Sequence, residues 1–427
     1  MAADPIRHRP MTTLTAPARG ARTDAAVIAL VALAHGISHF SQLLLAPLFP
    51  WLKVEFGASY AELGALMTIF FVVSCVVQTG AGFVVDRIGP RPVLFGGLAL
   101  LGVSALGFAA SQSYAMLAAV SVLAGIGNGV FHPADYTLLN RKVHESRLGH
   151  AFSSHGISGS LGWALAPALL VPLTLAFSWR VALGCAAALA FAVCGFLWLQ
   201  RDRLALELAP AAPRPAAQPG PSADGPSADG SFDFLRIPSV WMCFGFFLFY
   251  AVALSGVQTF APEAARLLHN VPMALVAICL TLYMVSSATG MFAGGFVARD
   301  PARCERIVAA GFGVAATIAL LMAFADLPAL AVPVLFGAMG FAAGLAAPSR
   351  DLLVKRASPA NATGRVYGVV YSGLDIGQAL APLAFGALMD RQQPAAVWLG
   401  IAAVQAVLVV SAFNVRRVRR TVWASAT

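Results

Sequence analysis

Four histidines and one aspartate stand at spacings suited to proton exchange within otherwise apolar segments. His35 and His39 are four residues apart, which places them one turn apart on one face of a helix. His132 and Asp135 are three apart and share a face of another helix, and His155 lies in the next apolar segment. Histidine titrates near neutral pH, so this set predicts a proton carrier or a switchable cationic site.

Further polar residues extend this candidate site. Gln42 continues the helix face of His35 and His39. Asn128 lies in the Gly-rich stretch just before His132. In the second half no apolar segment contains a histidine, and Asp375 is the ionisable candidate. A charged group inside a bilayer costs on the order of 2.5–3.5 kcal/mol on insertion scales, so it marks a functional site by default. The expected substrate and proton pathway is His35, His39, Gln42, Asn128, His132, Asp135, His155, Gln258, Tyr371, Asp375 and Gln378.

Structural roles compete with this interpretation. Each histidine is also suited to be a neutral hydrogen-bonding partner between helices. Asp135 has basic neighbours in Arg141 and Lys142, so an interfacial ion pair is its alternative role. Asp375 has the alternative of a structural hydrogen bond to a neighbouring helix.

The same histidines and carboxylate also offer donor atoms of the kind that transition metals bind. An intramembrane metalloenzyme is therefore a remote alternative, which bound metal in the purified protein would favour. No nucleophile or phosphate-binding loop accompanies the histidines, so we expect no enzyme, no cofactor, no resident metal and no direct use of ATP.

The elements that position these residues are membrane helices. The chain has 427 residues, of which 59% are hydrophobic and 11% charged, against roughly 25% charged residues in soluble domains. Mean hydropathy is +0.77. We expect an all-α polytopic protein with twelve spans, at residues 25–50, 61–85, 93–110, 114–140, 150–172, 178–199, 238–262, 271–298, 306–325, 329–353, 364–389 and 394–414.

One internal linker divides these spans into two six-helix halves. Residues 200–237 are rich in Pro, Ala, Gly, Ser and Asp and repeat the sequence PSADG, which predicts a flexible segment. The expected domains are a tail at 1–24, a first bundle at 25–199, the linker at 200–237, a second bundle at 238–414 and a tail at 415–427.

Basic residues are distributed unevenly over the two ends of the spans. Of 28 Lys and Arg, 24 fall on the side of the termini and the linker, so both termini are expected in the cytoplasm of a bacterial inner membrane. This topology also explains the net charge of +9 without a nucleic-acid partner. The first 24 residues lack the apolar run and cleavage site of a signal peptide, so the first helix is expected to stay in the membrane.

The two halves repeat at an offset of 215 residues. Gly125–Pro167 and Gly340–Pro382 match at eleven positions without a gap, most of them Gly, Pro or Ala. The charges are not repeated, since His132, His155 and Ser160 correspond to Ala347, Val370 and Asp375. Such repeats predict a two-fold arrangement with a binding site between the halves near the midplane of the membrane.

The loop after the second span carries a recognisable motif. Residues 82–91 read GFVVDRIGPR, with Gly82, Asp86, Arg87, Gly89 and Arg91 as its characteristic positions. This sequence resembles the helix 2–3 loop of the major facilitator superfamily, although Pro90 stands where a basic residue is usual. The second copy ends in Arg299 and Asp300, which reverses the order of the charges. The resemblance implies a gate and conformational latch formed by Gly82, Asp86, Arg87, Gly89 and Arg91.

A narrower resemblance lies in the first half. The stretch GIGNGVFHP at 125–133, together with His39, Gln42 and PLFP at 47–50, is similar to the fosmidomycin-resistance family of that superfamily. That family consists of proton-coupled exporters of small drugs and related compounds. Glu often follows the His-Pro pair there, whereas Ala134 follows here and the acid is Asp135.

These observations predict a proton-coupled antiporter that exports a small polar or anionic compound by alternating access. The alternative is a proton symporter that takes up a small metabolite. The expected partners are a small-molecule substrate, protons and the lipid bilayer, and we expect a functional monomer.

We predict that His132→Ala abolishes proton-coupled transport while the protein still inserts, because the imidazole would carry the coupling proton. Transport driven by a pH gradient in reconstituted vesicles measures this. Coupling at the wild-type level in the variant contradicts the assignment.

Overall fold

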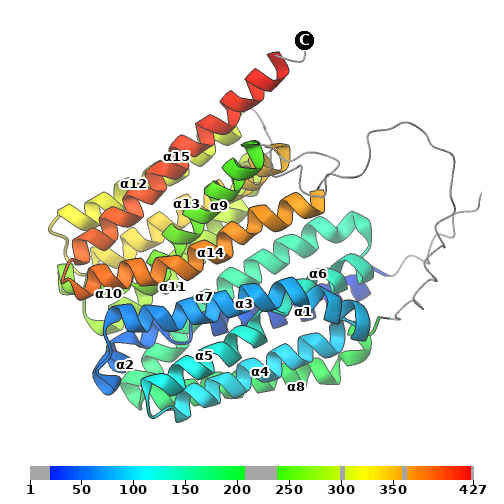
Figure 1. Cartoon of the computed structure of the whole chain (residues 1–427), viewed down its shortest axis with the longest axis horizontal. Helices are drawn as coiled ribbons and strands as arrows, with labels where there is room; N and C mark the ends of the chain where they lie inside the picture. The colour runs from blue at the N-terminus through cyan, green and yellow to red at the C-terminus, as the bar shows by residue number, and fades with distance from the viewer. Residues whose placement is uncertain (1–19, 207–237, 299–302, 358–362, 425–427) are drawn as a thin grey trace, which may run out of the picture.

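The computed structural model describes residues 20–206, 238–298, 303–357 and 363–424 and shows helices and no strand among them (Figure 1). The first half packs in the lower part of Figure 1 and the second half in the upper part. Helices of the first half are α1 (Ala21–Gln42), α2 (Phe49–Phe56), α3 (Tyr60–Ile88), α4 (Pro90–Ala110), α5 (Tyr114–Asn128), α6 (Phe131–Lys142), α7 (Leu148–Ala176) and α8 (Trp179–Leu199). Helices of the second half are α9 (Pro238–Thr259), α10 (Ala261–His269), α11 (Met273–Val297), α12 (Cys304–Phe324), α13 (Ala331–Ala357), α14 (Thr363–Asp390) and α15 (Pro394–Ala424).

The fold is that of a twelve-helix membrane protein. Eleven stretches within the described residues are long and apolar enough to span a bilayer. The remaining long helix, α14, has 28 residues and packs against α9 of its own half and α3 of the other half. With α14 the expected twelve spans are accounted for.

Three expected spans are each divided into two helices. The span at 25–50 breaks between α1 and α2, that at 114–140 between α5 and α6, and that at 238–262 between α9 and α10. Pro47, Pro133 and Pro262 follow the breaks by a few residues. Proline has no N–H to donate to the carbonyl four residues earlier, so the helical ladder stops there.

Several boundaries differ from those expected from the sequence. α1 begins at Ala21, within the expected tail, and α15 continues to Ala424, beyond the expected end at 414. After α8, a short 3₁₀ helix (Arg201–Leu204) still packs on the first half, because Leu204 is fully buried in its core. Most of the expected linker, 207–237, lies outside the described residues.

Glycine permits close packing between helices in both halves. A side-chain carbon at Gly162 on α7 would overlap the carbonyl oxygen of Gly36 on α1. In the second half, one at Gly373 on α14 would lie 2.6 Å from the carbonyl oxygen of Phe244 on α9. These backbones approach closely only because no side chain intervenes.

The two halves meet through polar contacts at the end of the bundle that carries α2 and α10, here called the far end (Figure 1). The Asp390 carboxylate of α14 accepts hydrogen bonds from the backbone N–H groups of Tyr60 and Ala61, at 2.7 and 2.8 Å. These N–H groups begin α3, where a negative charge is favourable. The Tyr60 hydroxyl donates to Glu263 of α10 at 2.9 Å, so three elements are joined across the interface.

The far-end contact extends to a charged pair on α10. Arg266 donates two hydrogen bonds of 2.7 Å to the Glu263 carboxylate, and this bonding raises the pKa of the Arg266 guanidinium. Further along the interface, the Thr68 hydroxyl of α3 donates to the carbonyl of Ala379 on α14 at 2.6 Å. The far end is therefore closed by polar contacts between the halves, and a separate hydrogen bond joins them further along the interface.

We expect Gly162→Val to lower the free energy of unfolding by about 1–3 kcal/mol, the usual effect of overpacking a close contact. Thermal unfolding of the purified protein in detergent measures the change. Gly195→Val on α8 is the matched control, because a side-chain carbon there meets no atom within 4 Å. Equal melting temperatures for the two variants contradict this account of the packing.

Candidate functional site

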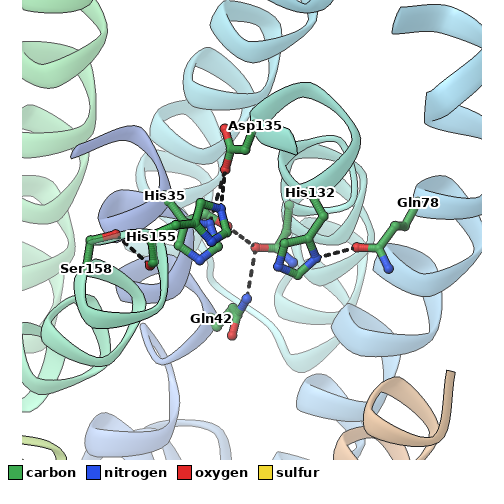
Figure 2. A network of polar contacts seen from close by, with 9 residues as sticks. His35, Gln42, Gln78, His132, Asp135, His155 and Ser158 are labelled. Carbon is green, nitrogen blue, oxygen red and sulfur yellow. Dashed lines mark hydrogen bonds and ion pairs between the residues drawn. The ribbon is translucent and has the colours of Figure 1, made fainter. Parts of the chain in front are cut away.

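A single carboxylate oxygen joins three helices in the first half. Asp135 on α6 is fully buried, and its Oδ2 lies 3.2 Å from His35 Nδ1 on α1 and 3.1 Å from His155 Nε2 on α7 (Figure 2). His35 and His155 are themselves 2% and 5% exposed. The structure thus brings together three candidate residues that lie up to 120 positions apart in the chain.

The histidine rings form one contiguous cluster. The His35 and His155 rings stack, with centroids 3.4 Å apart and planes inclined by 24°. The His39 centroid lies 4.3 Å from that of His35, and the His132 centroid 5.5 Å from it. All four predicted histidines therefore belong to one site.

His132, which its spacing places on one helix face with Asp135, forms its hydrogen bond with a residue of another helix. Its Nδ1 lies 2.7 Å from Oε1 of Gln78 on α3, so it links α6 to α3 (Figure 2). Gln78 was not predicted as a site residue. The sequence could have identified Gln78, because it is a polar amide in an otherwise apolar span.

A second set of hydrogen bonds lies beside the histidines and converges on Asn128. Its Oδ1 accepts from Ser38 at 2.7 Å and from Gln42 at 3.3 Å, and its Nδ2 donates to Ser74 at 2.8 Å. Trp163 Nε1 donates to Gln42 Oε1 at 2.9 Å. Asn128 and Gln42 were expected at the site, whereas the two serines and the tryptophan were not. This network fixes α1, α3, α5 and α7 around the histidine cluster.

The charge of the cluster changes by single protons. An ionised carboxylate accepts but does not donate, so the ring nitrogens that face Asp135 must both carry hydrogen when it is charged. With neutral imidazoles the group of Asp135, His35 and His155 then holds one negative charge, and one added proton neutralises it. An uncompensated charge is costly in the membrane interior, so this group is chemically suited to bind a proton.

The alternative pairing of Asp135 with nearby cations is not what the structure shows. Lys142 Nζ instead donates to the backbone carbonyl of Ala205 at 2.6 Å, and Arg141 is exposed at the end of α6. Asp135 is held by imidazoles because α6 turns its buried face toward α1 and α7.

Two overlapping groups of side chains have donor atoms within 4.8 Å of one another. One consists of His35, His39 and His132, and the other of His35, Asp135 and His155. Imidazole and carboxylate donors suit divalent transition metals such as zinc. Metal binding is therefore a chemical capability of this site alongside proton binding.

Asp375, Gln258 and Gln378, the predicted residues of the second half whose side chains the structure describes, do not join this cluster. Asp375 on α14 interacts instead with the Cys75 thiol of α3, across the interface between the halves. Gln258 lines a separate small cavity of about 30 Å³ near the far end, beside Thr259 and Glu263. Gln378 Oε1 is buried without a hydrogen-bond partner among the described residues, and the side chain of Tyr371 lies outside them.

Arg350 on α13 is a candidate that the sequence interpretation missed, because it lies near the end of the expected span at 329–353. Its guanidinium carbon lies 4.3 Å from the centroid of the Tyr250 ring on α9 and 5.4 Å from that of Phe247. The 215-residue repeat carried the signal, because it aligns Arg350 with Asp135 and Tyr250 with His35. The second half thus has a cation stacked on an aromatic ring where the first half has its carboxylate and histidine.

The predicted gating loop is a very short turn between α3 and α4. Gly89 adopts φ 87°, in the region that glycine favours, and Pro90 begins α4. Asp86 and Arg87 are exposed in the last turn of α3, and Gly82 and Arg91 flank the turn on the two helices. The counterpart at Arg299 and Asp300 lies outside the described residues.

Comparison with known proteins agrees with this architecture. The family model of the Major Facilitator Superfamily matches residues 31–382. A solved bacterial homolog to the human lysosomal transporter Spinster, in an inward-facing and occupied conformation, superposes with a TM-score of 0.71, at 15% identity over 94% of this chain and 98% of that one.

Two curated relatives are similar over shorter regions. The fosmidomycin resistance protein of Escherichia coli is 28% identical over 163 residues, 38% of this chain and 39% of that protein. A probable 4-methylmuconolactone transporter of Cupriavidus pinatubonensis is 31% identical over 152 residues, 34% of this chain and 35% of that protein. The chain thus aligns with less than half the length of either relative.

The family match covers most of the chain, and the helices form the same fold as a solved transporter of this kind. A membrane transporter rather than an enzyme is therefore indicated. The chain belongs to the major facilitator superfamily.

Proposed function

We propose that this transporter couples the movement of a small acidic compound to protons, with export in exchange for protons as the leading direction. The observation that carries the proposal is the fully buried Asp135 carboxylate held between His35 and His155. Buried ionisable groups in a membrane interior commonly belong to substrate or proton pathways. The other two histidines extend the pathway, His132 through Gln78 and His39 through its contact with the Trp163 ring.

The coupling step follows from the charge of this cluster. Protonation replaces one buried negative charge with a neutral group. The electrostatic attraction between Asp135 and the N–H groups of its two imidazole neighbours then becomes weaker. Since these residues lie on α1, α6 and α7, the change acts on the packing of three helices at once. A ligand or proton shifts alternating access only by binding one state more strongly than the other, and this cluster offers such a difference.

The closed far end supports a specific conformational state. Polar contacts between the halves join Tyr60 to Asp390, Thr68 to Ala379, and Thr281 to Ala164. With the basic residues at the other end assigned to the cytoplasm, the far end faces outward and the described state is closed toward the outside. The turn at Gly82–Arg91 then lies at the cytoplasmic end, where we propose that it acts as the conformational latch. Both termini are cytoplasmic in this assignment, the membrane is a bacterial inner membrane, and the monomer is the working unit.

The relatives support an acidic substrate. One is named for resistance to fosmidomycin and the other for transport of 4-methylmuconolactone, and both compounds carry an acidic group. Export is favoured by the resemblance to the former. The metalloenzyme alternative has no comparable support, because the family is one of transporters.

A proton symporter is the second candidate, and the opposite charges of Asp135 and Arg350 at equivalent positions favour it. If the anion at Arg350 and the proton on Asp135 are bound in the same conformational state, substrate and proton cross together; if each is bound in a different state, they exchange. The lumen pH of inverted vesicles after addition of fosmidomycin distinguishes the two, because it rises for antiport and falls for symport.

We predict that Asp135→Asn abolishes transport driven by a pH gradient, with a loss of about tenfold or more, since the amide cannot take up the coupling proton. Exchange of labelled for unlabelled fosmidomycin without a gradient should persist in proteoliposomes, because it needs no proton transfer. Asp326→Asn, at an exposed carboxylate, is the matched control and should behave as wild type. Gradient-driven transport at the wild-type level in the Asp135 variant would refute the proposal.

A further inference from the structure

A cation on the second half has no role in the proton site described above. Arg350 lies on α13, is neither fully buried nor fully exposed, and stacks over the Tyr250 ring of α9 at 4.3 Å. Phe247, which is 1% exposed, flanks the same guanidinium at 5.4 Å. Two aromatic rings from one helix thus fix the position of a planar cation presented by another.

The repeat shows how far this site departs from its counterpart. Arg350 and Tyr250 occupy the positions of Asp135 and His35, while Leu254 and Ala347 replace His39 and His132. Ala347 is 4% exposed and Leu254 is 8% exposed, so apolar side chains stand where the first half has imidazoles. Among the described side chains, the counterpart site in the second half therefore consists of apolar and aromatic residues beside the Arg350 guanidinium.

The two sites also differ in accessibility. Asp135 is completely buried, whereas part of the Arg350 side chain remains exposed. A guanidinium binds a carboxylate or phosphonate through two parallel N–H···O bonds. In a membrane interior such a pair is stronger than in water, because the surroundings screen it less.

We infer that Arg350, positioned by Tyr250, forms the subsite that binds the acidic group of the substrate. The ligand class is a small carboxylate or phosphonate whose apolar part lies against the neighbouring aliphatic and aromatic side chains. This inference rests on the proposed function and deepens it, because it assigns substrate recognition to the second half and leaves proton binding in the first.

The experiment measures equilibrium binding to the purified full-length protein with fosmidomycin, 4-methylmuconolactone and the methyl ester of the latter. The wild type should bind at least one of the acids and bind the ester at least about tenfold more weakly, since the ester cannot form the charge-assisted pair. Arg350→Gln should weaken binding of the acids by about tenfold or more, and Arg350→Lys should restore part of it. Tyr250→Ala should weaken it less, through loss of the stacked orientation.

Arg306→Gln is the control, because it removes the same charge from an exposed position on α12 and should bind the acids as wild type does. Unchanged melting temperatures show that the variants are folded. If Arg350→Gln is unstable, acid binding by Arg350→Lys tests the inference instead. Retention of acid binding and of discrimination against the ester in Arg350→Gln overturns the inference. So does a wild type that binds neither acid, or that binds the ester as tightly as its acid. Proton coupling is judged separately by Asp135→Asn, so the inference can fail while the proposed function stands.

Discussion

One buried carboxylate is the constraint on which the site in the first half depends. Asp135 has no exposed surface, and its Oδ2 is stabilised by two ring nitrogens from different helices. A negative charge in such surroundings requires either these donors or a proton. The positions of α1, α6 and α7 are therefore tied to the protonation of a single site. The neighbouring Asn128 network holds the adjacent helices so that the imidazoles keep their orientation.

The two halves share a scaffold and differ in chemistry. Glycines recur at the 215-residue offset because both halves need the same close helix contacts. The repeated prolines act differently, since Pro133 follows the break between α5 and α6 whereas its counterpart Pro348 lies inside the continuous helix α13. The ionisable groups do not recur: imidazoles and a carboxylate lie in the first half, and Arg350 stacks on Tyr250 in the second. In our proposal this asymmetry separates proton binding, in the first half, from recognition of an acidic substrate, in the second. The shared scaffold allows the two halves to rock against each other.

Hydropathy and the repeat were enough to predict the twelve spans and their two-fold arrangement, because a bilayer imposes the length and composition of each helix. Helical spacing correctly grouped His35 with His39. The bonding of His132 to Gln78, and of Asp135 to histidines rather than to nearby cations, depended on contacts between helices remote in the sequence. Arg350 was missed because its closeness to the end of α13 suggested a loop charge, although the repeat aligned it with Asp135.

The central claim is that Asp135 and its two histidines exchange a proton when substrate binds. Isothermal titration of the purified protein with fosmidomycin, in buffers of different ionisation enthalpy, counts the protons taken up or released on binding. The account predicts a non-zero count for the wild type and a count of zero for Asp135→Asn, with binding still measurable in both. Equal proton counts for the two proteins would contradict it.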